Sequence, residues 1–538
     1  MAIDSKLWNR LSPANQNEVI GLLPILGGKC SQLATVSRAW RSIIEPLNFA
    51  EISLTVPRLT EPNSQAILVR KRNQIRYIWF RVELKRYDCT ECESNNQDRW
   101  GLDAVDNQFI VNAFHKLFRT LSAWEPRGDL VLDISVYSPS DNQHWFKYIS
   151  FYSDTDTVEP SHHGHEHGVT VNDPAHGWVV GQPIAAPSEH TIDHVFDEIM
   201  GEGPFPDDET EFQWWRSLPR VPVVGVVLFR QQTRRRWKPL AIANMLTRFP
   251  NIKEVCYEPW RELGGMDLQT DKWNQKLIES FPQIGSLCKL TIFENVDQSY
   301  PEIYRQTYPG IHRAPAIRVP SQGVSQGLAR TSQHLEMLSA SFMADASLFF
   351  AAPQIQYSGT WSKLTSLALT SNVLTGDADP QYVSDMLQNA AYTALKMPRL
   401  NVMELWNGRK GVAMLFRYQR PREDGEPAVI TVRGTSELAL ETTVVEAWDL
   451  VAYRHGHSKV AIQTSSIDPN EIKSHGDAIC QLGLLTEVTR PVSLRQIINE
   501  NSVSRARPLP PPPRSSYLEY RTILAMIEIW DQQRQQQQ

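Results

Sequence analysis

Histidines and cysteines are the residues of this sequence that could bind a metal ion. Residues 162–167 read His-His-Gly-His-Glu-His, and His176 follows them. Neutral imidazoles bind zinc or copper well, but residues 153–187 are rich in Ser, Asp, Gly and Pro, which is typical of a solvated loop. Cys89 and Cys92 form a single C-x-x-C pair, whereas a zinc ribbon needs a second pair. We therefore expect ordinary loop cysteines, no metal site and no cofactor.

Two short motifs resemble catalytic ones without meeting their requirements. Residues 27–30 read Gly-Gly-Lys-Cys, but Leu23 stands where the first glycine of a phosphate loop should be, and a cysteine replaces the Ser or Thr that would hold Mg²⁺. Ser474, His475 and Asp477 are close in the sequence, but this closeness does not produce the geometry of a catalytic triad. We therefore expect no catalytic residue in this chain.

A basic cluster around Trp237 could contact RNA or phosphate groups. Acidic residues lie shortly upstream and could neutralise this cluster within the chain. We expect a solvated surface or intramolecular ion pairs here, and no nucleic-acid partner. The basic residues are Arg230, Arg234, Arg235, Arg236 and Lys238, and the acidic residues are Asp207, Asp208, Glu209 and Glu211.

The composition narrows the class of protein. The chain has 538 residues, a net charge of −6 and 41% hydrophobic residues, which is enough apolar content to build folded cores. Its six cysteines are too few for a disulfide scaffold and indicate a reducing compartment. The first residues carry no secretory signal, and the most apolar stretch, Val221 to Phe229, is too short to span a membrane. We expect a soluble protein of the cytoplasm or nucleus with no membrane partner.

Residues 1–50 are predicted to form a small helical module. Ser12 is placed to cap a first helix that begins at Pro13. Gly27-Gly28 then breaks the chain, and Pro46 is expected to end the last of three helical segments. Three short helices bury little apolar surface by themselves, so this module needs a partner.

The module resembles an F-box. Residues 33–41, Leu-Ala-Thr-Val-Ser-Arg-Ala-Trp-Arg, match the Leu-x-x-Val-Ser-x-x-Trp-Arg part of the family pattern. The first half departs from it, because Pro13 is displaced by one position and Gly27-Gly28 replaces a leucine-bearing link. The resemblance implies a face that docks on the Skp-type adaptor of a cullin–RING ubiquitin ligase, although the same apolar stripe could pack on the rest of the chain. The residues implied are Leu11, Pro13, Val19, Ile20, Leu23, Leu33, Val36 and Trp40.

Apolar triplets of the Leu-x-x-Leu-x-Leu type recur through the body of the chain at irregular intervals. Helical patterns lie between them, including 110–121, 239–246, 273–281 and 383–395. This alternation predicts an α/β part over residues 51–240, with a long loop at 153–211, and a leucine-rich-repeat-like α/β solenoid over 241–500. An ordinary α/β domain whose strands carry leucines is the alternative. The triplets are Ile75/Ile78/Phe80, Leu218/Val221/Val223, Ile252/Val255/Tyr257, Leu287/Leu290/Ile292, Leu335/Leu338/Ala340, Leu364/Leu367/Leu369 and Leu400/Met403/Leu405.

The pattern changes after the last triplet. Asn407-Gly408 between two apolar runs predicts a hairpin turn, and a strand at 429–432 and helices at 443–453 and from 474 follow. The stretch containing Trp406-Asn407-Gly408 and Phe416-Arg417-Tyr418 resembles the C-terminal region of a large, biochemically obscure group of F-box-like proteins from filamentous fungi. Residues 501–538 are predicted to hold a proline-rich linker, a helix and a glutamine-rich end.

These features together predict a non-enzymatic protein that recruits another protein. The F-box resemblance implies a substrate-recognition subunit of a Skp–cullin–F-box type ubiquitin ligase, whose partners are the Skp-type adaptor with its cullin complex and an unknown target. The mechanism would be proximity rather than chemistry. The alternatives are a binding scaffold that does not join a ligase and, less favoured, a hydrolase or transferase in the α/β body.

Overall fold

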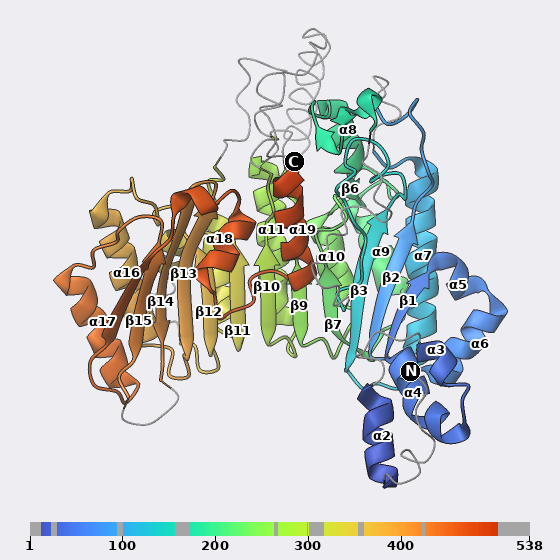
Figure 1. Ribbon diagram of the computed structural model, residues 1–538, viewed down its shortest axis with the longest axis horizontal. Helices are drawn as coiled ribbons and strands as arrows, with labels where there is room; N and C mark the ends of the chain where they lie inside the picture. The colour runs from blue at the N-terminus through green and yellow to red at the C-terminus, as the bar shows by residue number, and fades with distance from the viewer. Residues whose placement is uncertain are drawn as a thin grey trace.

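The computed structural model describes residues 12–22, 30–93, 101–155, 172–262, 267–297, 300, 317–352, 360–421 and 426–503. One large sheet organises these residues (Figure 1). Its twelve strands are β1 (Glu51–Thr55), β2 (Tyr77–Glu83), β3 (Leu130–Tyr137), β7 (Val224–Phe229), β9 (Glu254–Tyr257), β10 (Lys289–Phe293), β11 (Met337–Ser341), β12 (Ser366–Thr370), β13 (Val402–Arg409), β14 (Val412–Gln419), β15 (Val429–Gly434) and β16 (Ala461–Ser466).

The strands lie in the sheet in the order in which they occur along the chain. All neighbours are parallel except β13–β14 and β14–β15, which are antiparallel. The predicted mixed α/β class is therefore confirmed, and the structure adds that the sheet is mostly parallel. The pairing of β7 with β9 joins the two predicted parts, 51–240 and 241–500, within this one sheet.

Helices connect the strands. Near the N-terminus these are α2 (Pro13–Leu22), α3 (Cys30–Leu33), α4 (Arg38–Ala50), α5 (Val56–Thr60), α6 (Pro62–Lys71) and α7 (Ala104–Ser122). The middle of the chain contains α8 (Glu189–Val195), α9 (Asp208–Ser217), α10 (Pro239–Leu246), α11 (Asp267–Ser280), α13 (Gln322–Ser332) and α14 (Ala346–Phe350). The last are α16 (Pro380–Ala394), α17 (Thr442–Arg454), α18 (His475–Leu482) and α19 (Pro491–Val503). None of the helices in the described ranges is both long and apolar enough to cross a membrane.

The apolar triplets lie side by side in the sheet. Leu290 pairs with Val255 on one side and with Leu338 on the other, and Leu338 pairs in turn with Leu367. Equivalent triplet positions of β9 to β13 thus form continuous rows of buried side chains. The triplet at 218–223 is an exception, because it precedes β7 and Val227 takes the place opposite Val255.

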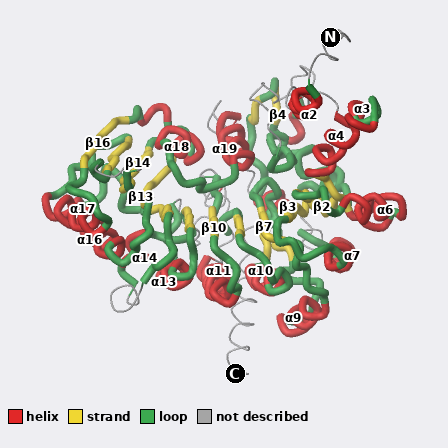
Figure 2. The backbone as a smooth tube through the Cα atoms, turned by 90° about the horizontal axis from the view of Figure 1, so that it is seen from below, coloured by secondary structure: helices red, strands yellow, loops and turns green. Residues whose placement is uncertain are grey.

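The connecting helices cover one face of the sheet. In Figure 2, α7, α10, α11, α13, α14 and α16 lie on one side of the strands, and α18 and α19 lie on the other. Successive residues of a strand point to opposite faces, so Ile78 and Phe80 join the main apolar core under the helices while Tyr77 and Trp79 face the other way. The predicted helices at 110–121, 239–246, 273–281 and 383–395 fall on α7, α10, α11 and α16.

Two local predictions were wrong in detail. The hairpin turn lies at Lys410–Gly411 because Asn407 and Gly408 pair within β13, and Gly411 adopts the positive φ of 75° that the turn requires. Gly408 is instead needed for close packing, since a Cβ there would lie 2.8 Å from Cβ of Ala478 in α18. Pro46 does not end its helix, because α4 continues through it to Ala50.

The predicted long loop at 153–211 contains regular structure in its described part. It includes η3 (Pro174–His176), α8 and the beginning of α9. It also includes β4 (Trp178–Val179), which pairs with β5 (Gln182–Pro183), and β6 (Glu198–Ile199), which pairs with β8 (Arg236–Trp237). A small apolar cluster that includes Phe146, Ile192 and Trp260 supports this region.

Candidate functional site

The sheet face opposite the connecting helices is covered by the end of the described chain. We call residues 467–503, which include α18 and α19, the C-terminal segment. Ile479 and Leu482 of α18 share an apolar cluster with Trp406 of β13 and Leu415 of β14. The residues at the start of α19 contact residues that follow β7 and β9, as the hydrogen bonds below show. The C-terminal segment therefore occupies the face on which a solenoid would be expected to bind a target.

Glu258, directly after β9, is the principal polar anchor of the C-terminal segment. Its carboxylate is buried and accepts hydrogen bonds from Oγ1 of Thr489 at 2.8 Å, the backbone N–H of Arg490 at 2.7 Å and Oγ of Ser493 at 2.5 Å. The backbone N–H of Gln231 adds a fourth, longer bond at 3.3 Å. Burial raises the pKa of Glu258, and the bonds from Arg490, Ser493 and Thr489 oppose this shift.

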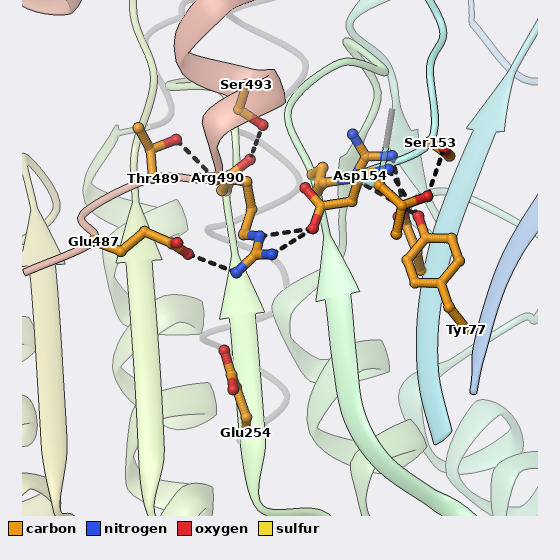
Figure 3. A network of polar contacts seen from close by, with 12 residues as sticks. Tyr77, Ser153, Asp154, Glu254, Glu487, Thr489, Arg490 and Ser493 are labelled. Carbon is orange, nitrogen blue, oxygen red and sulfur yellow. Dashed lines mark hydrogen bonds and ion pairs between the residues drawn. The ribbon is translucent and has the colours of Figure 1, made fainter. Parts of the chain in front are cut away.

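The side chain of Arg490 extends the network to the first strands of the sheet (Figure 3). Its guanidinium donates to Oδ2 of Asp154 through Nε at 2.9 Å and Nη2 at 2.5 Å. The backbone N–H of Asp154 donates to the hydroxyl of Tyr77 at 2.9 Å, and this hydroxyl donates to Asp133. Arg230 donates to the same Asp133 oxygen at 2.6 Å and 2.9 Å, and both side chains are fully buried. Burial raises the pKa of Asp133, and the Arg230 charge opposes this shift.

Two more buried carboxylates hold the C-terminal segment at its centre and its end. Glu404 of β13 accepts the backbone N–H groups of Leu485 and Thr486 at 2.9 and 2.8 Å. Arg234 donates to Glu500 of α19 at 2.7 Å, with both side chains almost completely buried. Burial raises the pKa of Glu500 to about 7, against the opposing charge of Arg234. These contacts fasten the C-terminal segment to the sheet.

His475, the first residue of α18, is a buried titratable group within this attachment. Its ring packs near Phe293 and Phe342, and its Nε2 lies 2.8 Å from Oδ1 of Asn295. Burial lowers the pKa of His475 to about 4, whereas an exposed histidine has a pKa of about 6.5. As the pH falls below about 6.5 the unfolded chain gains a proton that the folded chain does not accept until about pH 4, so stability is lost across this interval.

We expect His475 to cost the folded state about 2 kcal/mol when the pH is lowered from 7 to 5. His475→Gln should remove this loss, because glutamine can still donate to Asn295 and does not titrate. Urea unfolding midpoints of both proteins at the two pH values measure the difference. Burial also lowers the pKa of His144 and His455, so the comparison with the variant is essential. An equal loss in both proteins would contradict the assignment.

The predicted adaptor-binding residues are placed unequally. Of the residues on α2 to α4 and the turn between α3 and α4, Val19 and Val36 are exposed, Leu33 and Trp40 are half-buried, and Ile20 is buried. Pro13 begins α2 as predicted, where Oγ of Ser12 accepts the N–H of Asn15. Leu11 and Leu23 lie outside the described residues, as does the glycine-rich part of residues 27–30.

Cys89 and Cys92, predicted as ordinary loop residues, lie beside two histidines from distant parts of the chain. Sγ of Cys89 is 3.8 Å from Nδ1 of His144, Sγ of Cys92 is 3.4 Å from Nε2 of His176, and the two ring nitrogens are 3.3 Å apart. Burial lowers the pKa of His144 and raises that of Cys92 to about 12. These residue types could hold a metal ion. The histidine-rich residues 162–167, considered for that role from the sequence, lie outside the described residues.

The other candidate motifs have structural explanations. Oγ of Ser474 caps α18 by accepting the N–H of Asp477 at 3.3 Å, while His475 faces Asn295, so these residues do not form a triad. The basic cluster around Trp237 makes intramolecular ion pairs, which was one of the two arrangements predicted for it. Its pairs are Arg230–Asp133, Arg234–Glu500, Arg235–Asp141, Lys238–Asp208 and Lys238–Glu211.

Comparison with family models shows that part of this chain is similar to a known family. A family model described as "Family of unknown function (DUF6546)" matches residues 280–490. The chain is similar to that family from just before β10 to the residue that precedes α19. The matched range includes Glu404 and His475, and it leaves out the N-terminal helices and the Cys-His cluster. A search of curated proteins found no match.

Proposed function

We propose that this protein is a substrate-recognition subunit of a Skp–cullin–F-box type ubiquitin ligase. In this proposal α2, α3 and α4 form an F-box-like module that docks on a Skp-type adaptor. The strand–helix units of the body form a leucine-rich-repeat-like array that carries a target protein. The protein then acts by raising the local concentration of the target near a ubiquitin-loading enzyme.

The observation that carries the proposal is the uncovered apolar surface of the N-terminal helices. Val36 is 60% exposed, Leu47 45% and Val19 37%. In the described part of this module, only Ile20 and Ile44 have less than one tenth of their surface exposed. A partner protein that packs on these three exposed residues would remove their apolar surface from water. The helices lie at the β1 end of the sheet, where an adaptor could reach them (Figure 1).

The aligned triplets support the repeat-like part of the proposal. Rows of buried side chains run across β9 to β13, and a helix follows each of β7, β9, β10, β11 and β12 on the same face. A target, however, has no access to the face that the C-terminal segment covers. We therefore assign target contacts to the loops and edges of the sheet, outside that covered face.

A hydrolase or transferase is less well supported by the cavities of the described residues. A cavity of about 410 Å³ lies near the amino ends of β10 and β11 and includes Cys288, His334 and Glu336 in its lining. Burial, with the charges of Glu336 and Glu254, raises the pKa of the Cys288 thiol. This keeps Cys288 protonated and a weak nucleophile at neutral pH.

Co-purification with a Skp-type adaptor and cullin tests the proposal. Wild type should bind, and Val19→Asp/Val36→Asp should bind at least ten-fold more weakly, because each carboxylate would be placed in an apolar interface. Both positions are exposed, so the free protein should fold normally. A Leu33→Ala/Trp40→Ala variant, which removes two half-buried anchors, should lose about 2 kcal/mol or more of binding free energy.

The matched control is Val105→Asp, an equally simple change at a valine that is 70% exposed on α7. It should leave adaptor binding unchanged. Failure of wild type to bind would favour the scaffold that does not join a ligase. Full binding by the Val19→Asp/Val36→Asp protein would show that another surface makes the contact.

A further inference from the structure

Four potential metal ligands meet at the carboxyl ends of β2 and β3. Cys89 and Cys92 lie in the turns that follow β2, His144 lies in the turns that follow β3, and His176 ends η3. The ligand atoms of Cys89, His144 and His176 all lie within 4.8 Å of one another. The sulfur of Cys92 is outside this compact set and lies 3.4 Å from Nε2 of His176. Cys92, His144 and His176 are buried, while Cys89 reaches the surface.

Three of the distances between these atoms are close to those of a tetrahedral zinc site, and the sulfur of Cys92 would have to move closer to the other ligands to complete it. Zn–N and Zn–S bonds of about 2.05 and 2.3 Å place two nitrogens about 3.3 Å apart and a nitrogen and a sulfur about 3.6 Å apart. The nitrogens of His144 and His176 are 3.3 Å apart, and the two sulfur–nitrogen distances are 3.4 and 3.8 Å.

Both histidines are oriented by groups on their other ring nitrogen. Nδ1 of His176 is 2.7 Å from Oδ2 of Asp173, which Lys147 also contacts at 2.8 Å. Nε2 of His144 faces the backbone carbonyl of Tyr87 at 3.4 Å, and the two rings stack. A carboxylate or carbonyl on the second nitrogen fixes the tautomer that leaves the first nitrogen free to bind a metal.

We propose that Cys89, Cys92, His144 and His176 bind one structural Zn²⁺ ion. Two sulfurs and two imidazole nitrogens in a tetrahedron are the ligand set of zinc. Binding releases the two thiol protons to solvent, and the resulting site of one Zn²⁺, two thiolates and two neutral imidazoles carries no net charge. All four positions are filled by the protein, so the ion fastens the segments after β2 and β3 to η3 and has no open position for a substrate.

Metal analysis of the full-length, tag-free protein tests this proposal independently of adaptor binding. Wild type purified without chelator should contain one zinc per chain, and Cys89→Ser and His176→Ala should each contain at least ten-fold less. Cys480→Ser, which removes an exposed cysteine elsewhere, should keep its zinc. A variant with His162, His163, His165 and His167 changed to alanine should also keep it, which separates this site from adventitious binding by the histidine-rich segment.

Two further measurements keep the test valid if a variant folds poorly. In wild type, a chelator should increase the alkylation rate of Cys89 at least ten-fold and leave that of the exposed Cys480 unchanged. Replacement of the metal by Co²⁺ should give the visible absorption of a tetrahedral thiolate site. Equal alkylation of Cys89 with and without chelator, a Cys89–Cys92 disulfide, or zinc lost only in the four-histidine variant would each overturn the proposal.

Discussion

Glu258→Ala is expected to lower the free energy of unfolding by about 3 kcal/mol and to loosen the C-terminal segment from the sheet. The substitution removes the acceptor shared by Thr489, Ser493 and the backbone N–H groups of Arg490 and Gln231. Without this acceptor, the buried donors have lost their hydrogen bonds to water and gain no hydrogen bond in the protein, which destabilises the folded state. Urea unfolding gives the stability change, and hydrogen exchange of residues 485–503 reports whether the segment opens.

Glu254→Ala is the matched control for this prediction. Glu254 begins β9, the strand that Glu258 follows, but it is partly exposed and pairs only with Lys289 among the described ion pairs, at 2.9 Å. Loss of such a pair should cost no more than about 1 kcal/mol. Equal destabilisation by both substitutions, or unchanged exchange of the C-terminal segment in Glu258→Ala, would show that Glu258 is not its anchor.

Arg230→Met is expected to be the most destabilising single change, by about 3–5 kcal/mol. It leaves the Asp133 carboxylate in a fully buried position, with the Tyr77 hydroxyl as its remaining hydrogen-bond donor. Asp133→Asn in the same chain should recover much of the loss, because a neutral amide is far cheaper to bury than a carboxylate. Urea unfolding midpoints of the wild type, the two single variants and the double variant form a double-mutant cycle that measures this recovery.

Arg72→Met provides the comparison for an exposed ion pair. Arg72 contacts Glu125 at 2.8 Å, with both side chains at least one third exposed. Its loss should change the free energy of unfolding by no more than about 1 kcal/mol. If the double variant were no more stable than Arg230→Met alone, the cost would come from packing around Arg230 and not from the uncompensated charge of Asp133.

Local apolar patterns in the sequence identified many of the strand residues that pack against the helices. Residues such as Leu290, Leu338 and Leu367 recur in short apolar runs, and in the structure they pair with one another. β3 was not recognised because Asp133 and Ser135 interrupt its apolar run; both point to the opposite face. A search for apolar triplets detects only one face of a strand.

The polar face could not be predicted because its partners are distant in the sequence. Nothing near Glu258 or Glu404 indicates that residues 485–493 supply their hydrogen-bond donors. The Cys-His cluster has the same difficulty, since His176 lies 84 positions after Cys92 and rules for zinc motifs depend on short spacings. The C-x-x-C pair and His176 were both considered from the sequence, but nothing in the sequence linked them to each other or to His144.

The C-terminal segment also has a consequence for the order in which the chain can fold during synthesis. Arg490 is 336 positions from its partner Asp154, and Glu500 is 266 positions from Arg234. The strands can pair with their predecessors as they leave the ribosome, but these charged groups gain their partners only after residues 490 to 500 have been synthesised. Contacts of such long range form late. A chain that ends before residue 467 would therefore expose Glu258, Glu404 and Trp406 to the cell, and chaperones could distinguish it from a chain that contains the C-terminal segment.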